Sequence, residues 1–508
     1  MLNDLYGPTS LALLTDLYQL TMAYGYWKSG TWDREAVFLL HFRKPPFASG
    51  YTIACGLDPA IEFIERFRYT PEDLDYLATL RGNDGSPLFE TAFLDVLRRL
   101  ELTCDIDAIP EGTAVFPHQP LLRVRGPLLQ AQLLETPLLN LINFQTLIAT
   151  KAARVCLAAQ GEPVLEFGLR RAQGIDGAMA ASRAAYAGGC AATSNVLAGK
   201  HFGIPVRGTH AHSWVLSFDS ELEAFEAYAR ALPNNCVFLV DTFDTLLGVR
   251  HAIEIGRRLR ARGHEMAGIR LDSGDLAWLS IEARRLLDEG GFPRVQIVAS
   301  SELDEHLIES LKLQGARIAV WGVGTKLVTG DEDPALGGVY KLTAIRDPRE
   351  PHEPGGAWKH KVKLSEQSVK ITTPGLLQVR RFSQGAEFIA DMIWDELLGT
   401  PPDAPTLVDP NDLTRRKEIA AGTPSEELLV PIFRQGRRVY DPPPLDAVRA
   451  RTLDQLGHFH SGIKRLINPH QYPVGLELGL FDLKTQLILE ARGHVHAAAG
   501  AHGHGEHP

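Results

Sequence analysis

The chain has 508 residues, of which 44% are hydrophobic and 22% charged, a balance typical of globular proteins rather than of disordered chains. Its formal net charge is -10 and its pI is near 6.0, which argues against non-specific binding to nucleic acid, where a basic surface is expected. The five cysteines are scattered and form no CxxC pair, so neither a disulfide framework nor a zinc ribbon is predicted.

The N-terminus carries Asp4 and Asp16 and lacks the basic-then-apolar order of a signal peptide. No uninterrupted apolar run reaches the roughly 18 residues of a membrane span. We therefore expect a cytoplasmic protein that does not associate with a membrane. The length predicts more than one structural unit.

Residues 1–160 are predicted to form an N-terminal α+β domain. Apolar residues recur at helical spacing over 9–28, and Thr70 followed by Pro71 begins a predicted helix over 71–80. The other predicted elements of this part are a strand at 36–42, a helix at 57–68, strand material at 114–125 and a long, largely buried helix at 128–159.

Residues 161–345 alternate short apolar runs with helix-like stretches. The runs begin near residues 164, 206, 237, 267, 295 and 318, and helices are predicted at 219–232, 245–262, 276–290 and 303–314. This alternation indicates parallel strands joined by right-handed helical crossovers. The segment is shorter than the roughly 250 residues of a full eight-fold barrel, so an irregular or incomplete β/α barrel is predicted.

Residues 346–492 are predicted to form an appended C-terminal subdomain that packs on the N-terminal domain, with strands in 360–390 and helical character in 443–468. Residues 493–508 read as a flexible, histidine-rich tail. Its histidines could bind a metal ion, although adventitious binding by a loose tail is the simpler interpretation.

Ligands of parallel α/β proteins bind beyond the carboxyl ends of the strands, which directs attention to 206–214. If this segment stays extended, His210 and His212 point to the same face. Either could be a neutral structural histidine. A His-x-His pair there could also belong to the metal site of an amidohydrolase-type barrel, but that site needs further histidines, and the later strand ends supply Arg270, Asp272 and Ser300 instead.

The segment 268–275 places Arg270 and Asp272 on one face of a predicted strand. A structural ion pair is one interpretation. The other is a ligand with anionic and hydroxyl groups, which arginine and aspartate would bind respectively. Asp275 could instead cap the following helix.

Glycines follow the last predicted strand, at Gly322 and Gly324, before Thr325. Such glycines let backbone N–H groups approach a phosphate, although tight turns explain most Gly-x-Gly pairs. The remaining strand ends are 166–171, with Phe167, Arg170 and Arg171, then 241–244 and 299–302. The aspartates at 241 and 244 could be helix caps. No P-loop motif is present.

These segments resemble the nicotinate phosphoribosyltransferase family over roughly residues 9–345. The resemblance is carried by Leu14-Thr15-Asp16-Leu17-Tyr18-Gln19-Leu20-Thr21-Met22, Asn143-Phe144-Gln145-Thr146, Phe167-Gly168-Leu169-Arg170-Arg171-Ala172, Gly208-Thr209-His210-Ala211-His212-Ser213, Arg270-Leu271-Asp272-Ser273-Gly274-Asp275 and Gly322-Val323-Gly324-Thr325. Several long motifs in one order make the resemblance specific. It implies a barrel of the type II phosphoribosyltransferase kind.

The resemblance also implies a reaction: nicotinate, 5-phosphoribosyl 1-pyrophosphate, ATP and water give nicotinate mononucleotide, pyrophosphate, ADP and phosphate. It makes His212 the residue that ATP phosphorylates, and leaves His210 at the variable position of the motif. Asp272 is the second predicted catalytic residue. The predicted substrate-binding residues are Tyr18, Phe167, Arg171, Thr209, Arg270, Ser301, Gly322, Gly324 and Thr325.

By the same resemblance the enzyme uses Mg²⁺, whose protein ligands stay unassigned, with ATP as co-substrate. It is expected to be a homodimer with shared active sites, in which Tyr18 acts across the interface, and to take part in NAD biosynthesis. Two alternatives remain open at this point: a nicotinamide phosphoribosyltransferase with the same fold, and a non-catalytic phosphosugar-binding barrel.

Overall fold

The computed structural model describes residues 6–7, 10–350, 356–367, 370–410, 412 and 414–501, with side chains as far as residue 493. The chain divides into two compact units: residues 1–144, 336–443 and 454–508 form unit 1, and residues 145–335 and 444–453 form unit 2. Within the described residues, no helix has both the length and the apolar character needed to span a membrane.

Unit 1 contains two large sheets. The first has the order β13-β12-β1-β5-β3-β19-β20 and is antiparallel throughout. Its strands are β1 (Glu35–Phe42), β3 (Asp105–Ala108), β5 (Leu122–Pro127), β12 (Gly338–Arg346), β13 (Lys359–His360), β19 (Val430–Arg434) and β20 (Arg437–Arg438). Strand β1 lies between β12 and β5 and is buried along nearly its whole length, so strands from distant parts of the chain meet in this sheet.

The second sheet of unit 1 has the order β17-β16-β21-β15-β14-β18. Its strands are β14 (Leu377–Gln384), β15 (Glu387–Asp395), β16 (Thr406–Val408), β17 (Arg416–Glu418), β18 (Ser425–Glu427) and β21 (Val474–Glu477). A buried ion pair between Arg381 and Asp391 ties β14 to β15, and Arg381 also donates a hydrogen bond to the carbonyl oxygen of Ala114 in β4 (Ala114–Val115). These bonds compensate the two buried charges, which would destabilise the fold if they had no partners.

The remaining elements of unit 1 are mostly helices. They are α2 (Leu17–Lys28), η1 (Pro46–Ala48), α3 (Leu57–Arg66), α4 (Pro71–Thr79), α5 (Thr91–Arg98), α6 (Leu128–Leu133), η4 (Glu396–Leu398), η5 (Ser461–Lys464) and α17 (Leu478–Ala501), with a small sheet of β2 (Thr52–Ile53) and β4 (Ala114–Val115). Helices α7 (Glu135–Ala158) and α16 (Leu445–Gly457) have residues in both units.

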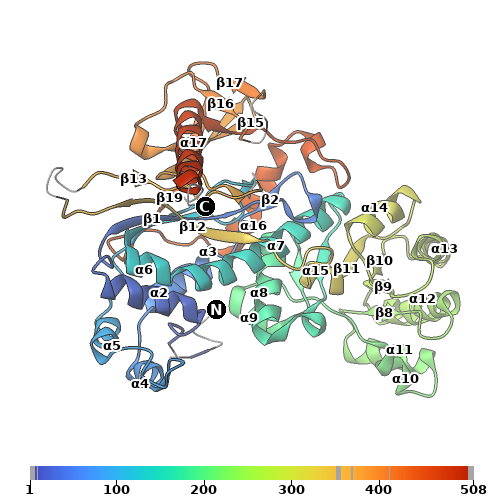
Figure 1. The fold of residues 1–508 in the computed structure, drawn as a ribbon. Coiled ribbons are helices and arrows are strands. Elements are labelled where there is room, and N and C mark those ends of the chain that lie inside the picture. Colours follow the sequence, from blue (N-terminus) through green and yellow to red (C-terminus); the bar gives the residue numbers. More distant parts are fainter. Residues whose placement is uncertain are drawn as a thin grey trace, which may run out of the picture. The chain divides into compact units, whose positions relative to one another are not determined.

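Unit 2 is an open sheet of six parallel strands in the order β7-β6-β11-β10-β9-β8. Its strands are β6 (Val164–Glu166), β7 (Ala192–Thr193), β8 (Val237–Leu239), β9 (Gly268–Leu271), β10 (Gln296–Ala299) and β11 (Val320–Val323). The helices that follow the strands are η2 (Leu169–Arg171), α8 (Gly174–Ala187), α9 (Val196–Phe202), α10 (His212–Leu216), α11 (Glu221–Ala231), α12 (Thr245–Ala261), α13 (Leu276–Glu289), α14 (Glu305–Leu313) and α15 (Thr325–Val328). Figure 1 shows β8 to β11 side by side, with α12 and α13 beside them. In the described part of unit 2, β7 and β8 do not pair, so the predicted irregular, incomplete barrel is confirmed.

Several local predictions are confirmed. The strand predicted at 36–42 is β1, and the helix predicted at 71–80 is α4, where Thr70 and Asp73 form a reciprocal capping box and Pro71 occupies the first turn. The predicted long helix at 128–159 is two helices, α6 and α7, separated by Leu134.

Three expectations are wrong in part. The helix predicted from residue 9 begins at Leu17, after a series of turns, and residues 8 and 9 lie outside the described residues. No strand forms at Val206, which makes only an isolated bridge with Thr193 between Pro205 and Gly208. The backbone of 493–501 continues helix α17 instead of a loose tail, and residues 502–508 lie outside the described part.

Candidate active site

His212 is the first residue of the short helix α10, which follows the irregular segment 207–211. Its Nδ1 atom lies 3.0 Å from Oγ1 of Thr242, the third residue after the carboxyl end of β8. Its Nε2 atom lies 3.8 Å from Oδ2 of Asp272 and 4.0 Å from Oδ1 of Asp241. The side chain is 39% exposed, so one ring nitrogen is held by the protein while the other is open to a ligand.

His210 has a different environment, because the expectation that 206–214 stays extended is wrong. The backbone N–H of Leu239 donates to Nε2 of His210 at 3.2 Å, and Nδ1 faces the carbonyl oxygen of Ala211 at 3.3 Å. The ring packs edge-on against Tyr228. Burial lowers the pKa of His210 to about 4, and the nearby charge of Arg270 acts in the same direction. His210 is therefore a neutral residue that anchors β8, and the two histidines do not share a face.

Arg270, in β9, connects the segment before α10 to the strand ends. Its Nη1 atom donates to Oγ1 of Thr209 and, at 3.3 Å, to the carbonyl oxygen of His210, and its Nη2 atom lies 3.7 Å from Asp272. Burial lowers the pKa of Arg270 while Asp272 and Asp241 act to raise it. An arginine stays protonated in proteins, so this site holds a fixed positive charge. Its Nε atom has no hydrogen-bond partner among the described residues.

Asp272 follows β9 and holds together the carboxyl ends of three strands. Its backbone N–H donates to Oδ2 of Asp241 at 2.8 Å, and Ser300 at the end of β10 donates a short hydrogen bond to Oδ1. Ser273 also donates to Asp241, at 2.7 Å. Asp272 is therefore not a helix cap. That role falls to Asp275, which caps α13, as the alternative interpretation of Asp275 predicted.

The carboxyl ends of β6, β10 and β11 continue the same edge. The ring of Phe167 lies over Gly322, since a side chain at position 322 would come within 2.6 Å of that ring and 3.4 Å of Cβ of Ser300. This close approach explains the glycine. Ser301 has a positive φ of 135°, a conformation that is rare outside glycine and clusters at functional sites. Thr325 begins α15 and donates to Glu302 at 3.4 Å.

The structure thus gathers most of the predicted residues at one edge of the unit 2 sheet: Phe167, Thr209, His212, Arg270, Asp272, Ser301, Gly322, Gly324 and Thr325. Two further predicted residues, Arg171 and Tyr18, lie on helical elements. Arg171 is exposed in η2, and it is Arg170 whose charge acts on Arg270. Tyr18 belongs to α2 of unit 1, with a side chain 48% exposed.

Two residues that contact or face His212 were not among the predicted site residues, namely Asp241 and Thr242. The sequence left 241–244 as a strand end with possible helix caps. Asp244 does cap α12, whereas Asp241 does not. The signal that could have separated them is position: Asp244 stands immediately before the helix, and Asp241 stands three residues earlier, right after the strand.

Asp241 and Asp272 are the two carboxylates that face Nε2 of His212, and their oxygens are of the kind that a hard divalent cation takes as ligands. Oδ1 of Asp241 is buried and has no hydrogen-bond partner in the described part of the chain, and carboxylate oxygens are the ligands that Mg²⁺ prefers. The described residues contain another acidic and histidine group, Glu305, His306 and Glu332. There Glu305 already pairs with Lys151 at 2.9 Å and Arg154 at 2.7 Å, which leaves that group less suited to a cation.

Comparison with known proteins agrees with this geometry. Residues 13–143 match the model of the nicotinate phosphoribosyltransferase N-terminal domain, and residues 378–484 match that of the C-terminal domain. A nicotinate phosphoribosyltransferase of Bacillus subtilis is 42% identical over 97% of this chain and 99% of its own length. The corresponding human protein is 35% identical over 94% of this chain and 96% of its own length. The crystal structure of human nicotinic acid phosphoribosyltransferase superposes with a TM-score of 0.79 at 32% identity, covering 93% of this chain and 99% of the other. This chain belongs to the nicotinate phosphoribosyltransferase family.

Proposed function

We propose that the protein catalyses the transfer of a phosphoribosyl group from phosphoribosyl pyrophosphate to nicotinate, coupled to the hydrolysis of ATP, as a step of NAD biosynthesis. Family membership supports the reaction. One structural observation supports the coupling: the imidazole of His212 is bonded at Nδ1 and open at Nε2, where two carboxylates face it.

In this proposal Nε2 of His212 is the phosphoryl acceptor. When Nδ1 carries the proton, its N–H donates a hydrogen bond to Oγ1 of Thr242, and the lone pair available for attack is on Nε2. Nε2 then attacks the γ-phosphorus of ATP, the nitrogen–phosphorus bond forms, and the bond to the bridging oxygen breaks to release ADP. After ribosyl transfer, water attacks the phosphorus and the nitrogen–phosphorus bond breaks, which releases phosphate and restores the imidazole.

Arg270, Thr209 and Phe167 would position the substrates. The guanidinium of Arg270 suits the carboxylate of nicotinate or a phosphate group, and Thr209 orients it through their hydrogen bond. The ring of Phe167, lying over Gly322, offers a face on which a pyridine ring can stack. Ribosyl transfer develops positive charge at the anomeric carbon as pyrophosphate leaves, so the protein contributes mainly orientation and electrostatic stabilisation.

Asp241 and Asp272 are the residues that would hold Mg²⁺, which when bound would offset the negative charge of the phosphate groups. We also propose that the enzyme works in the cytoplasm as a homodimer with shared active sites, in which Tyr18 of one subunit contributes to the site of its partner. Arg171, Ser301, Gly324 and Thr325 complete the proposed substrate contacts.

The test is pyrophosphate release from phosphoribosyl pyrophosphate by the purified protein. Release should require nicotinate, and ATP should increase it. Equal activity with nicotinamide would instead assign the protein to the nicotinamide-using reaction. Binding of phosphoribosyl pyrophosphate without release under any of these conditions would indicate a non-catalytic phosphosugar-binding protein.

A further inference from the structure

A cavity of about 650 Å³ lies within unit 1. It is lined by parts of η1, the segment that follows β4, the hairpin of β16 and β17, and the residues that lead into β21. None of the residues gathered around His212 lines it. The volume falls in the range of sites for small molecules, which runs from about 300 to 1,000 Å³.

Backbone strain is concentrated around this cavity. In the described part of the chain, eight residues other than glycine have a positive φ, and four of them line the cavity or adjoin a residue that does: Phe47, Ala48, His118 and Asn468. Asparagine tolerates this conformation, but for a bulky residue such as Phe47, with φ of 57°, it is rare. Such strain persists where the surrounding structure fixes it and clusters at ligand sites. Ser301, at the candidate active site, shows the same feature.

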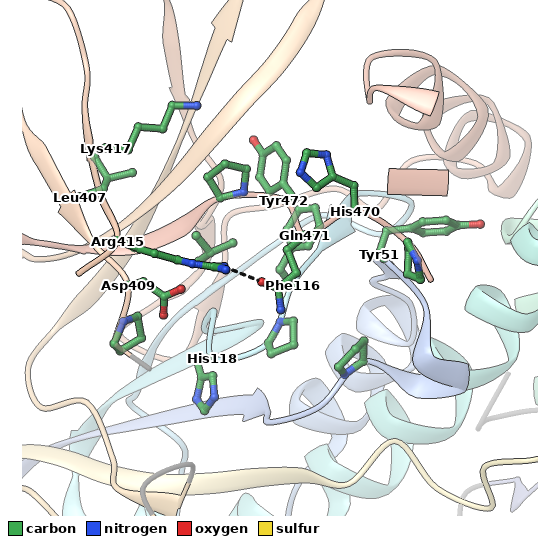
Figure 2. Close-up of a pocket in the computed structure, with 18 of the residues that line it drawn as sticks. Tyr51, Phe116, His118, Leu407, Asp409, Arg415, Lys417, His470, Gln471 and Tyr472 are labelled. Carbon is green, nitrogen blue, oxygen red and sulfur yellow. Dashed lines mark hydrogen bonds between the residues drawn. The ribbon is translucent and has the colours of Figure 1, made fainter. Parts of the chain in front are cut away.

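His118 supplies a neutral imidazole at the wall of the cavity (Figure 2). Burial lowers the pKa of His118 to about 4, and the charges of Lys484 and Arg43 lower it further, while Asp409 opposes them. At neutral pH the ring therefore offers one donor and one acceptor. No hydrogen bond from the described residues engages its ring nitrogens. Lys484 and Arg43 also make the electrostatic potential at this wall more favourable to an anion, and Asp409 acts against them.

Arg415 provides the cation that faces the cavity. Its Nη1 atom donates to Oε1 of Gln471 at 3.0 Å and its Nε atom pairs with Oδ2 of Asp412 at 3.2 Å, while its side chain is 63% exposed, so the guanidinium is oriented by two partners and still accessible to a ligand. Figure 2 shows Arg415 and Gln471 meeting across the cavity with the Asp409 carboxylate beside them. Arg416 and Lys417 follow on the same hairpin, and Asp409 is the acidic residue that lines the cavity.

The rest of the lining is mainly apolar and includes aromatic rings and prolines. The rings of Phe116 and Tyr472 stack with centroids 4.3 Å apart, and Pro45, Pro117 and Pro469 add flat, rigid surface. An apolar wall of this kind suits a planar ring. The cavity therefore combines a place for a ring, an acceptor for hydroxyl groups at Asp409 and a cation for an anionic group.

We propose that this cavity is a second ligand site, which binds a nucleoside monophosphate. The base lies against the apolar wall with its polar edge toward His118, the ribose hydroxyls donate to Asp409, and the phosphate pairs with Arg415. This site is separate from the proposed catalytic reaction and does not depend on it. Two simpler ligands fit the cavity less well. Inorganic phosphate would contact only Arg415. An aromatic amino acid carries no net charge, so it would not balance the positive charges of the hairpin.

Titration calorimetry of the full chain with AMP, GMP, CMP and UMP tests the proposal. At least one nucleotide should bind the wild type, and Arg415→Met should weaken it about tenfold, the effect of losing one charge-assisted hydrogen bond. Arg415→Lys should give an intermediate affinity, because it keeps the charge but not the planar fork. The matched control is Arg437→Met, which removes an exposed arginine from another hairpin of unit 1.

A nucleotide that binds in the catalytic site would have the same affinity for the wild type and for Arg415→Met, so the variant separates the two sites. The proposal is overturned if none of the four nucleotides binds, or if Arg415→Met and Arg437→Met weaken binding equally. It is also overturned if inorganic phosphate binds as tightly as the best nucleotide, since the cavity would then be a simple anion site. The unfolding curve of Arg415→Met should match that of the wild type.

Discussion

The Nδ1 atom of His212 lies 3.0 Å from Oγ1 of Thr242, on the opposite side of the imidazole from the carboxylates of Asp241 and Asp272. A neutral imidazole carries its proton on one nitrogen, and the hydrogen bond made by that nitrogen decides which one it is. In the proposed mechanism the hydroxyl of Thr242 accepts a hydrogen bond from the N–H at Nδ1, and this leaves the lone pair of Nε2 to act as the nucleophile. Thr242 is thus a positioning residue: it acts on the phosphoryl group only through the histidine.

Thr242→Val should lower ATP-dependent phosphorylation of His212 by about tenfold or more, in the range seen when hydrogen bonds that orient a reactive histidine are removed. Valine keeps the shape of threonine and removes the hydroxyl. Thr242→Ser restores the hydroxyl and should recover most of the rate. The measurement is single-turnover transfer of labelled phosphate from ATP to the protein. Equal rates in Thr242→Val and the wild type would show that the hydroxyl does not set the tautomer.

His212→Ala should remove the acid-labile phosphate that labelled ATP deposits on the protein and abolish the stimulation of ATP hydrolysis by nicotinate. The reason is that the phosphoryl acceptor is lost while the rest of the strand-end cluster remains. His306→Ala is a matched control, because His306 is a partly exposed histidine on α14 of the same unit. Nicotinate-stimulated hydrolysis that persists undiminished in His212→Ala would place the acceptor elsewhere.

Much of the fold could be predicted because the signals were local. Alternating apolar runs and amphipathic helices indicated a parallel β/α unit, and Thr70-Pro71 marked the start of α4. The strand predicted to begin near Val206 was wrong. Its apolar side chain suggested a strand, but it lies between Pro205 and Gly208 and forms only a single bridge. That bridge is decided by pairing with Thr193, a partner the local pattern does not reveal.

The sequence named most residues of the strand-end cluster, but not Asp241 or Thr242 and not the geometry of the cluster. The motif distinguished His212 from His210, and the structure supplies the physical difference: His210 accepts a backbone hydrogen bond from Leu239, 29 residues along the chain. Thr242 approaches His212 across a similar separation of 30 residues. Such contacts depend on where the first residue of α10 lies relative to the end of β8. The periodicity of apolar residues along the sequence carries no information about that position.

Arg270→Ala should raise the KM for nicotinate or phosphoribosyl pyrophosphate and lower kcat/KM about tenfold to a hundredfold, because the fixed cation that pairs with an anionic substrate group is lost. Arg270→Lys keeps the charge without the planar fork and should give an intermediate value. Steady-state kinetics with each substrate varied in turn identifies which anion the residue binds. Unchanged constants in a folded variant would leave Arg270 only a structural role, as the partner of Thr209, His210 and Asp272.

His210 predicts how stability depends on pH. Its pKa in the folded protein is about 4, below the ordinary value of 6.5, chiefly because of burial. Between these two values the unfolded chain binds a proton that the folded chain excludes, so the free energy of unfolding falls as the pH decreases from 6.5 toward 4. The full effect of this one group is at most about 3 kcal/mol. This contribution to the free energy of unfolding is fully present above pH 6.5 and is lost as the pH falls to about 4.

His210→Gln should flatten this dependence, because glutamine can accept the N–H of Leu239 but does not titrate. Urea unfolding at several pH values from 7 to 4.5 gives the slope for each protein. Other buried histidines, such as His41 with a pKa of about 3, add their own slopes to both proteins and cancel in the difference. His264→Gln is the matched control, since His264 is a partly exposed histidine of the same unit. Identical slopes for His210→Gln and the wild type would mean that the pKa of His210 is the same in the folded and the unfolded protein, so that burial does not hold the ring neutral.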